Sequence, residues 1–97
     1  MTDAQLRSLL RDCLKLWAVT GKVTVHDDGL VIDTSEGAFT VTRAEPDLRP
    51  VRWFYQTPER AAAGRAPRAA SSIVALLSAL RNAMAGMGGD RLRIGGS

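Results

Sequence analysis

Apolar residues recur at helical spacing near the start of the chain, with polar residues between them. These apolar positions are Leu6, Leu9, Leu10, Cys13, Leu14 and Trp17. Spacing of i, i+3, i+4 and i+7 is typical of a helix with one buried face. Thr2 and Gln5 match a capping box, and Gly21 favours the left-handed conformation that ends many helices. The pattern therefore predicts a helix over residues 3–19.

Alternating apolar and polar residues next predict three antiparallel strands. Asp28-Gly29 favours a two-residue turn that would pair Val25 with Ile32, and Glu36-Gly37 favours a second turn that would pair Ile32 with Val41. In this register one face of the sheet is apolar and the other is mostly polar. The apolar face would carry Val23, Val25, Leu30, Ile32, Phe39 and Val41, and the polar face Thr24, His26, Val31, Asp33, Thr40 and Thr42.

The second half of the chain has a weaker pattern. Residues 51–57 predict a fourth strand after a break at two prolines, and residues 58–66 predict a mobile loop. Pro67 suits the first turn of a second helix, which Gly86 would end. The apolar stripe of this helix would be Ile73, Leu76, Leu77, Leu80 and Met84. Residues 90–94 alternate basic with apolar side chains, which predicts either a short edge strand or a loose basic tail.

Together these elements predict an α+β fold, a two-layer sandwich. It would contain an N-terminal helix, a four-stranded antiparallel meander, a C-terminal helix and a possible short C-terminal edge strand. A length of 97 residues, 45% hydrophobic and 24% charged, suits one small globular domain over residues 1–94, followed by a disordered tail over 95–97. The N-terminal segment has no secretory pattern, so we expect a cytoplasmic protein with no membrane partner.

Positive charge gathers in the second half, which has a net charge of +6 against −3 for residues 1–47. Segment 49–68 contains five arginines, one acid and three consecutive aromatic residues. It predicts an anion-binding or partner-binding surface, because arginine and aromatic side chains are enriched at interfaces. The candidate residues are Arg49, Arg52, Trp53, Phe54, Arg60, Arg65 and Arg68. Codon bias in a GC-rich genome is the competing explanation for the arginine content.

Residues with catalytic potential are few. Cys13 is the only cysteine, and its place on the apolar face of the first helix favours packing over reactivity. His26 is the only histidine, and Asp27 and Asp28 beside it are sufficiently explained as turn residues. Ser71 or Ser72 could cap the second helix, or the start of that helix could hold an anion together with Arg65 and Arg68. No nucleophile, base and orienting group can be assembled, so we expect no enzyme, metal or cofactor.

The function expected from these features is that of a small non-catalytic interaction domain. We expect it to bind a protein partner or itself as a homodimer, because residues 69–80 carry no charge and one sheet face is open. The alternative is RNA or DNA binding through segment 49–68. The order of helix, three-strand meander and helix resembles that of double-stranded-RNA-binding domains. The strand predicted from Val51 and the lack of a lysine-rich motif depart from that plan.

Overall fold

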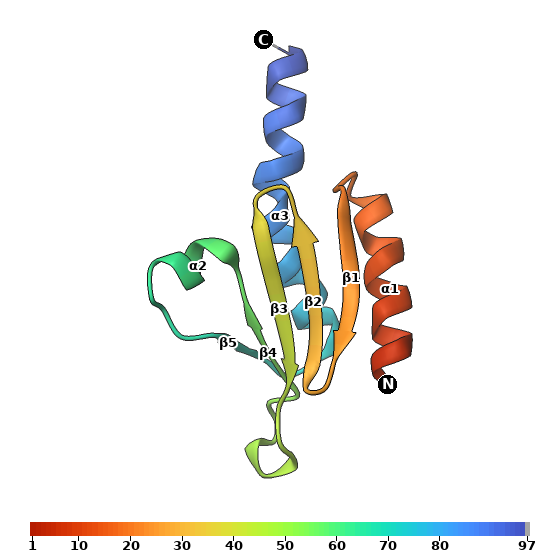
Figure 1. Ribbon diagram of the computed structural model, residues 1–97, viewed down its shortest axis with the longest axis vertical. Helices are drawn as coiled ribbons and strands as arrows, with labels where there is room; N and C mark the ends of the chain where they lie inside the picture. The colour runs from red at the N-terminus through yellow and green to blue at the C-terminus, as the bar shows by residue number, and fades with distance from the viewer. Residues whose placement is uncertain (97) are drawn as a thin grey trace.

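A computed structural model describes the backbone of residues 1–96 and the side chains of residues 1–85. The helices are α1 (Asp3–Leu16), the 3₁₀ helix η1 (Pro46–Leu48), α2 (Pro58–Ala62) and α3 (Ile73–Gly96). The strands are β1 (Gly21–His26), β2 (Gly29–Thr34), β3 (Gly37–Arg43), β4 (Trp53–Gln56) and β5 (Arg68–Ala70). All five strands form one antiparallel sheet in chain order (Figure 1). The α+β fold predicted from the pattern is confirmed, with β5 as an additional strand.

Helix α1 begins as predicted and ends earlier. The Thr2 hydroxyl accepts from the Gln5 N–H at 3.1 Å, and the Gln5 side chain accepts from the Thr2 N–H at 2.9 Å, which completes the capping box. The helix ends at Leu16 because Ala18 takes the left-handed conformation, with φ of 58°. The Val19 N–H then donates to the Leu14 carbonyl at 2.9 Å. The expectation that Gly21 ends the helix is wrong, since Gly21 opens β1.

Both hairpins are present, but their predicted registers are wrong by two residues. Val25 pairs with Leu30, so the first turn is Asp27-Asp28. Gly29 is the first residue of β2, where a Cβ atom would collide with the Val41 carbonyl of β3. Arg43, at the end of β3, donates its backbone N–H to the Asp28 carbonyl at 3.0 Å and a guanidinium N–H to the Asp27 carbonyl at 3.2 Å. The third strand therefore helps to hold this turn in place.

The second hairpin is shifted in the same sense. Ile32 pairs with Phe39 and Thr34 pairs with Gly37, so the turn is Ser35-Glu36. The Thr34 hydroxyl donates to the Gly37 carbonyl at 2.8 Å and accepts from the Glu36 N–H at 3.2 Å. A shift of two residues keeps every side chain on its original face, because side chains alternate with a period of two. The predicted division into an apolar and a polar face therefore holds despite the register error.

Residues after β4 fold differently from the prediction. The expected loop over 58–66 contains α2, whose first turn is capped by the Thr57 hydroxyl accepting from the Arg60 N–H at 3.2 Å. Pro67 does not start a helix, because the following residues pair with β4 as β5, with Ala70 opposite Trp53. Helix α3 starts later, at Ile73, where the Ser72 hydroxyl accepts from the Ala75 N–H at 3.1 Å.

The C-terminal helix also extends further than predicted. Gly86 does not end α3, which continues to Gly96 and extends beyond the end of the sheet (Figure 1). Glycine lowers helix propensity by about 1 kcal/mol without forbidding helical backbone angles, so a helix already started by packed residues can continue through it. The predicted edge strand or loose tail over residues 90–94 is therefore wrong, and Ser97 lies outside the described residues.

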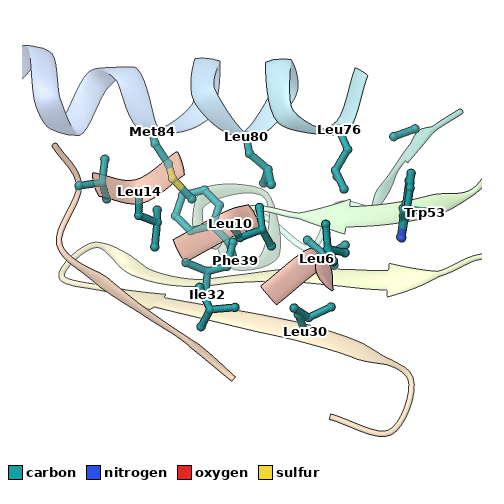
Figure 2. Packing of buried hydrophobic residues seen from close by; sticks show 14 residues of the cluster. Leu6, Leu10, Leu14, Leu30, Ile32, Phe39, Trp53, Leu76, Leu80 and Met84 are labelled. Atoms are coloured by element: carbon teal, nitrogen blue, oxygen red, sulfur yellow. The ribbon is translucent and has the colours of Figure 1, made fainter. Parts of the chain in front are cut away.

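One hydrophobic core lies between the helices and a single face of the sheet (Figure 2). Leu6, Leu10 and Leu14 enter it from α1, and Leu76, Leu80 and Met84 enter it from α3. The predicted stripe of α3 is confirmed, with Ile73 and Leu77 partly buried at its border. Five of the six residues predicted for the apolar face of the sheet are buried: Val23, Leu30, Ile32, Phe39 and Val41. The remaining one, Val25, is 45% exposed because it lies near the end of edge strand β1.

In the described part of the chain, no helix is long and apolar enough to cross a bilayer.

Candidate functional site

The structure divides segment 49–68 among three places. Arg49, Arg52 and Trp53 line a wide concavity at the end of the sheet where β3 ends. Phe54 lies on the sheet face opposite the core. Arg60, Arg65 and Arg68 belong to the α2–β5 segment, which the backbone carries away from that concavity (Figure 1). The residues predicted as one surface are therefore not brought together as a whole.

The concavity, which we call the arginine concavity, has a volume of about 760 Å³. Arg43, Arg49 and Arg52 line it, with Glu45 as the one acid among its lining residues. The remaining lining residues are mostly apolar: Met1, Ala44, Pro46, Pro50, Val51 and Trp53, together with Ser71. The concavity therefore combines a positive charge with apolar surface, which suits a ligand that has both anionic and apolar groups.

Backbone hydrogen bonds hold the walls of the concavity at both ends of the β3–β4 connection. The Ala44 N–H donates to the Arg52 carbonyl, and the Arg52 N–H donates to the Ala70 carbonyl, each at 2.9 Å. Between them, η1 is closed by the Leu48 N–H donating to the Glu45 carbonyl at 3.0 Å. The proline-containing break that interrupts the strand pattern is thus an ordered loop that presents Arg49 and Arg52.

The three arginines of the concavity differ in whether their side chains have ion-pair or hydrogen-bond partners. One Arg43 guanidinium nitrogen lies 3.5 Å from the Asp3 carboxylate of α1, and another donates to the Asp27 carbonyl. Among residues 1–85 the Arg43–Asp3 contact is the one ion pair, so Arg49 and Arg52 have no acidic partner there. Both are exposed. The side chains of Arg49 and Arg52 are therefore available to bind an anion, whereas the Arg43 side chain is held by Asp3 and the Asp27 carbonyl.

Arg43 was not among the residues predicted for a site. It lies in β3, outside the basic segment, and reaches the concavity because it pairs with Trp53 across the β3–β4 ladder. The one local feature of the sequence that could have indicated Arg43 as a site residue is its position at the end of a predicted strand, directly before the proline-containing break. The sequence pattern did not determine how β3 and β4 pair, and this pairing brings Arg43 to the same concavity as Arg49 and Arg52.

The sheet face opposite the core, which we call the open face, has no helix over it in the described part of the chain (Figure 1). Phe54 lies opposite Thr42 and Ala69 in one row of this face. The next row contains Thr24, Val31 and Thr40 in mutual pairing. None of these side chains is charged, and all of them except Ala69 are half-buried.

The arginines of the α2–β5 segment differ in exposure and in hydrogen bonding. Arg60 is half-buried and donates from its guanidinium group to the Ala66 carbonyl at 2.9 Å, which ties the segment to α2. Gln56 donates to the Arg65 carbonyl at 2.6 Å and anchors the same segment to β4. The side chains of Arg65 and Arg68 are exposed. Arg60 therefore stabilises the loop between α2 and β5, whereas Arg65 and Arg68 are accessible to a partner.

Of the residues weighed for catalysis or anion binding, Cys13, His26 and Ser72 do not line the arginine concavity, whereas Ser71 does. Cys13 is half-buried on α1, and burial raises the pKa of its thiol, with the Asp12 carboxylate adding to the shift. His26 contacts the Thr24 hydroxyl at 3.3 Å. Asp33, on the same sheet face, pairs with Lys22, while His26 pairs with Gly29. Ser72 caps α3. In the described part of the chain, no three His, Cys, Asp or Glu residues are grouped as metal ligands.

Comparisons of this chain with protein-family models, with curated proteins and with solved structures find no match.

Proposed function

We propose that the protein is a small non-catalytic interaction domain that binds protein and self-associates through the open face. The observation that supports this proposal is the uncharged pair of rows centred on Phe54, which no helix covers. Antiparallel sheets can expose one face to water, but a half-buried phenylalanine among threonine, valine and alanine is well suited to packing against a second sheet. A two-fold axis would place this patch against itself.

Self-association has a competing surface on α3. Val74 is 69% exposed at the start of that helix, next to the partly buried Leu77. This flank has no charge until Arg81. The two uncharged rows of the open face reach from Thr24 of β1 to Ala69 of β5, with Lys22 and Asp33 in the row beside them. The uncharged α3 flank is about two turns long. The experiment should therefore separate the two surfaces.

Light scattering across a concentration series tests the proposal with two matched variants. Thr42→Lys places a charged side chain beside Phe54 without removing a packed apolar group, and Val74→Lys adds the same charge on α3. We expect a dimer for the wild-type protein and for Val74→Lys, and a monomer for Thr42→Lys. A monomeric wild-type protein contradicts self-association. A dimer that survives Thr42→Lys but not Val74→Lys contradicts the choice of the open face.

Nucleic-acid binding is the second candidate function. It is supported by the exposed arginines Arg49, Arg52, Arg65 and Arg68, which give the surface a basic character. Base stacking has less support, because Trp53 is only 8% exposed and Tyr55 packs against the core. An RNA or DNA column distinguishes this candidate, since retention through phosphates must fall steeply as salt concentration rises. A protein that does not bind at low salt excludes it.

A further inference from the structure

The arginine concavity is separate from the open face. Arg43 and Trp53 share the side of the sheet that the helices cover, since Trp53 is buried in the core and Arg43 contacts Asp3 of α1. We propose that this concavity binds an acidic segment of a protein partner, an extended peptide in which carboxylate side chains alternate with apolar ones. This site is additional to the proposed self-association and does not depend on it.

The charge of the concavity favours an anionic ligand. Arg49 and Arg52 share its walls with Arg43 and have no ion pair among the described side chains. Like charges held near one another raise the energy of the empty site, and a bound carboxylate lowers it. Guanidinium groups bind carboxylates with paired, charge-assisted hydrogen bonds, which are stronger than neutral ones. Carboxylates of the peptide would therefore lie between Arg49 and Arg52.

The apolar wall specifies the rest of the ligand. Pro46, Pro50 and Val51 lie among the arginines and offer no hydrogen-bond donor from their side chains. In an extended peptide, neighbouring side chains point to opposite sides. Acidic residues can then face the guanidinium groups while the apolar residues between them rest on the proline and valine surface. A simple anion, such as inorganic phosphate, would leave that surface in water.

A peptide also fits the concavity better than a nucleic acid does. Trp53 is the aromatic residue of the wall, but with only 8% of its surface exposed it offers a base little ring surface to stack on. Glu45 adds a negative charge that would repel a chain of phosphates. Separate carboxylates on a peptide can avoid Glu45, whereas the evenly spaced phosphates of a nucleic acid strand cannot all do so.

Fluorescence anisotropy with the full chain provides the test. The probe is a short labelled peptide alternating Glu and Leu, compared with a Gln–Leu peptide, a Glu–Ser peptide and oligodeoxythymidine. The variants are Arg49→Gln with Arg52→Gln, and, as the matched control, Arg65→Gln with Arg68→Gln. Both pairs remove the same charge from exposed side chains, so circular dichroism should show an unchanged fold for each.

We expect the Glu–Leu peptide to bind most tightly of the four ligands. Loss of Arg49 and Arg52 should weaken its binding by about tenfold or more, and loss of Arg65 and Arg68 by less than about twofold. In an NMR titration the indole N–H resonance of Trp53 should shift on binding while that of Trp17 does not.

Four outcomes would overturn the inference. The first is no binding of the Glu–Leu peptide, and the second is an equal loss of affinity in both variant pairs. The third is a Glu–Ser peptide that binds equally well, which would remove the role of the apolar wall. The fourth is tighter binding of oligodeoxythymidine that depends on Arg49 and Arg52, which would assign the concavity to nucleic acid. Thr42 does not line the concavity. The Thr42→Lys variant should therefore bind the peptide as the wild-type protein does, whether or not the protein dimerises.

Discussion

Trp53 and Phe54 are neighbours in the chain and lie on opposite faces of the sheet. Trp53 pairs with Arg43 and is 8% exposed, whereas Phe54 pairs with Thr42 on the open face and is half-buried. We expect Trp53→Ala to lower the free energy of unfolding by about 3–5 kcal/mol, because it leaves a cavity in the core. Phe54→Ala should cost less, about 1–2 kcal/mol.

Urea denaturation measures both values. The two variants must be compared at one low protein concentration, because a dimer adds to the apparent stability of whichever protein forms it. A loss for Phe54→Ala as large as that for Trp53→Ala would contradict the assignment of the two aromatic residues to different faces.

Leu80 and Val74 lie on opposite sides of α3 and should respond differently to truncation. Leu80 is fully buried, and Val74 is 69% exposed. Leu80→Ala should lower the free energy of unfolding by about 2–5 kcal/mol, while Val74→Ala should change it by less than about 0.5 kcal/mol. The midpoint of chemical denaturation reports both values. Similar losses in the two variants would mean that the helix is rotated about its axis relative to the structure.

Gly29 should be intolerant of a side chain because of its neighbours rather than its backbone angles. A Cβ atom there would collide with the Val41 carbonyl and approach the Thr42 Cα to 2.9 Å. At Gly64, by contrast, a Cβ atom meets open space, but φ is +70°. We expect Gly64→Ala to cost about 1–2 kcal/mol through backbone strain, and Gly29→Ala to cost more because β2 and β3 must separate. Thermal denaturation of both variants provides the comparison. A Gly29→Ala protein as stable as the wild type would contradict the observed register.

The Cys13 thiol should react slowly in the folded protein. Burial raises its pKa, and Asp12 adds to the shift, so less of the reactive thiolate is present near neutral pH. Alkylation by iodoacetamide should therefore be slower in the native protein than in the unfolded chain, and its pH midpoint should lie above that of free cysteine. A native midpoint at or below that of free cysteine would contradict this prediction.

The same shift links Cys13 to the pH dependence of stability. The folded state keeps the thiol proton to higher pH than the unfolded chain does, so the unfolded chain binds fewer protons in that interval. Stability from this group is therefore present below the unfolded pKa and is lost as pH rises through the folded pKa. Cys13→Ala should decline less than the wild type over this alkaline range when unfolding is followed by circular dichroism. An identical decline in both proteins would show that Cys13 contributes nothing to it.

The parts of the fold that were predictable depend on contacts close in sequence. The capping box of Thr2 and Gln5 and the buried stripe of Leu76, Leu80 and Met84 are set by residues one helical turn apart. Strand faces were predictable for the same reason, since alternation is a local property. The register was not predictable, because a shift of two residues leaves the same side chains on each face. The close approach of Gly29 to Val41 selects one register, and that contact is made between strands.

The candidate site was predictable only in part. Arg49 and Arg52 do share a surface, as the basic segment suggested, but Arg60 is tied to the Ala66 carbonyl. Arg43 joins the surface from β3, and no pattern within segment 49–68 could have indicated it. Which arginines meet is determined by strand pairing and by loop hydrogen bonds, neither of which leaves a periodic signal.

By itself, the sequence determined the class of the fold, the apolar face of each main element and the start of α1, because periodicity and capping act between residues near one another in the chain. Only the tertiary structure decided the register, the short strand β5 and the convergence of Arg43 with Arg49 and Arg52. Strand β5 has three residues and no alternating pattern of its own, so its extended form comes from pairing with β4. Pairing between strands brings together residues that are distant in the chain, and the local sequence pattern does not specify which of them meet.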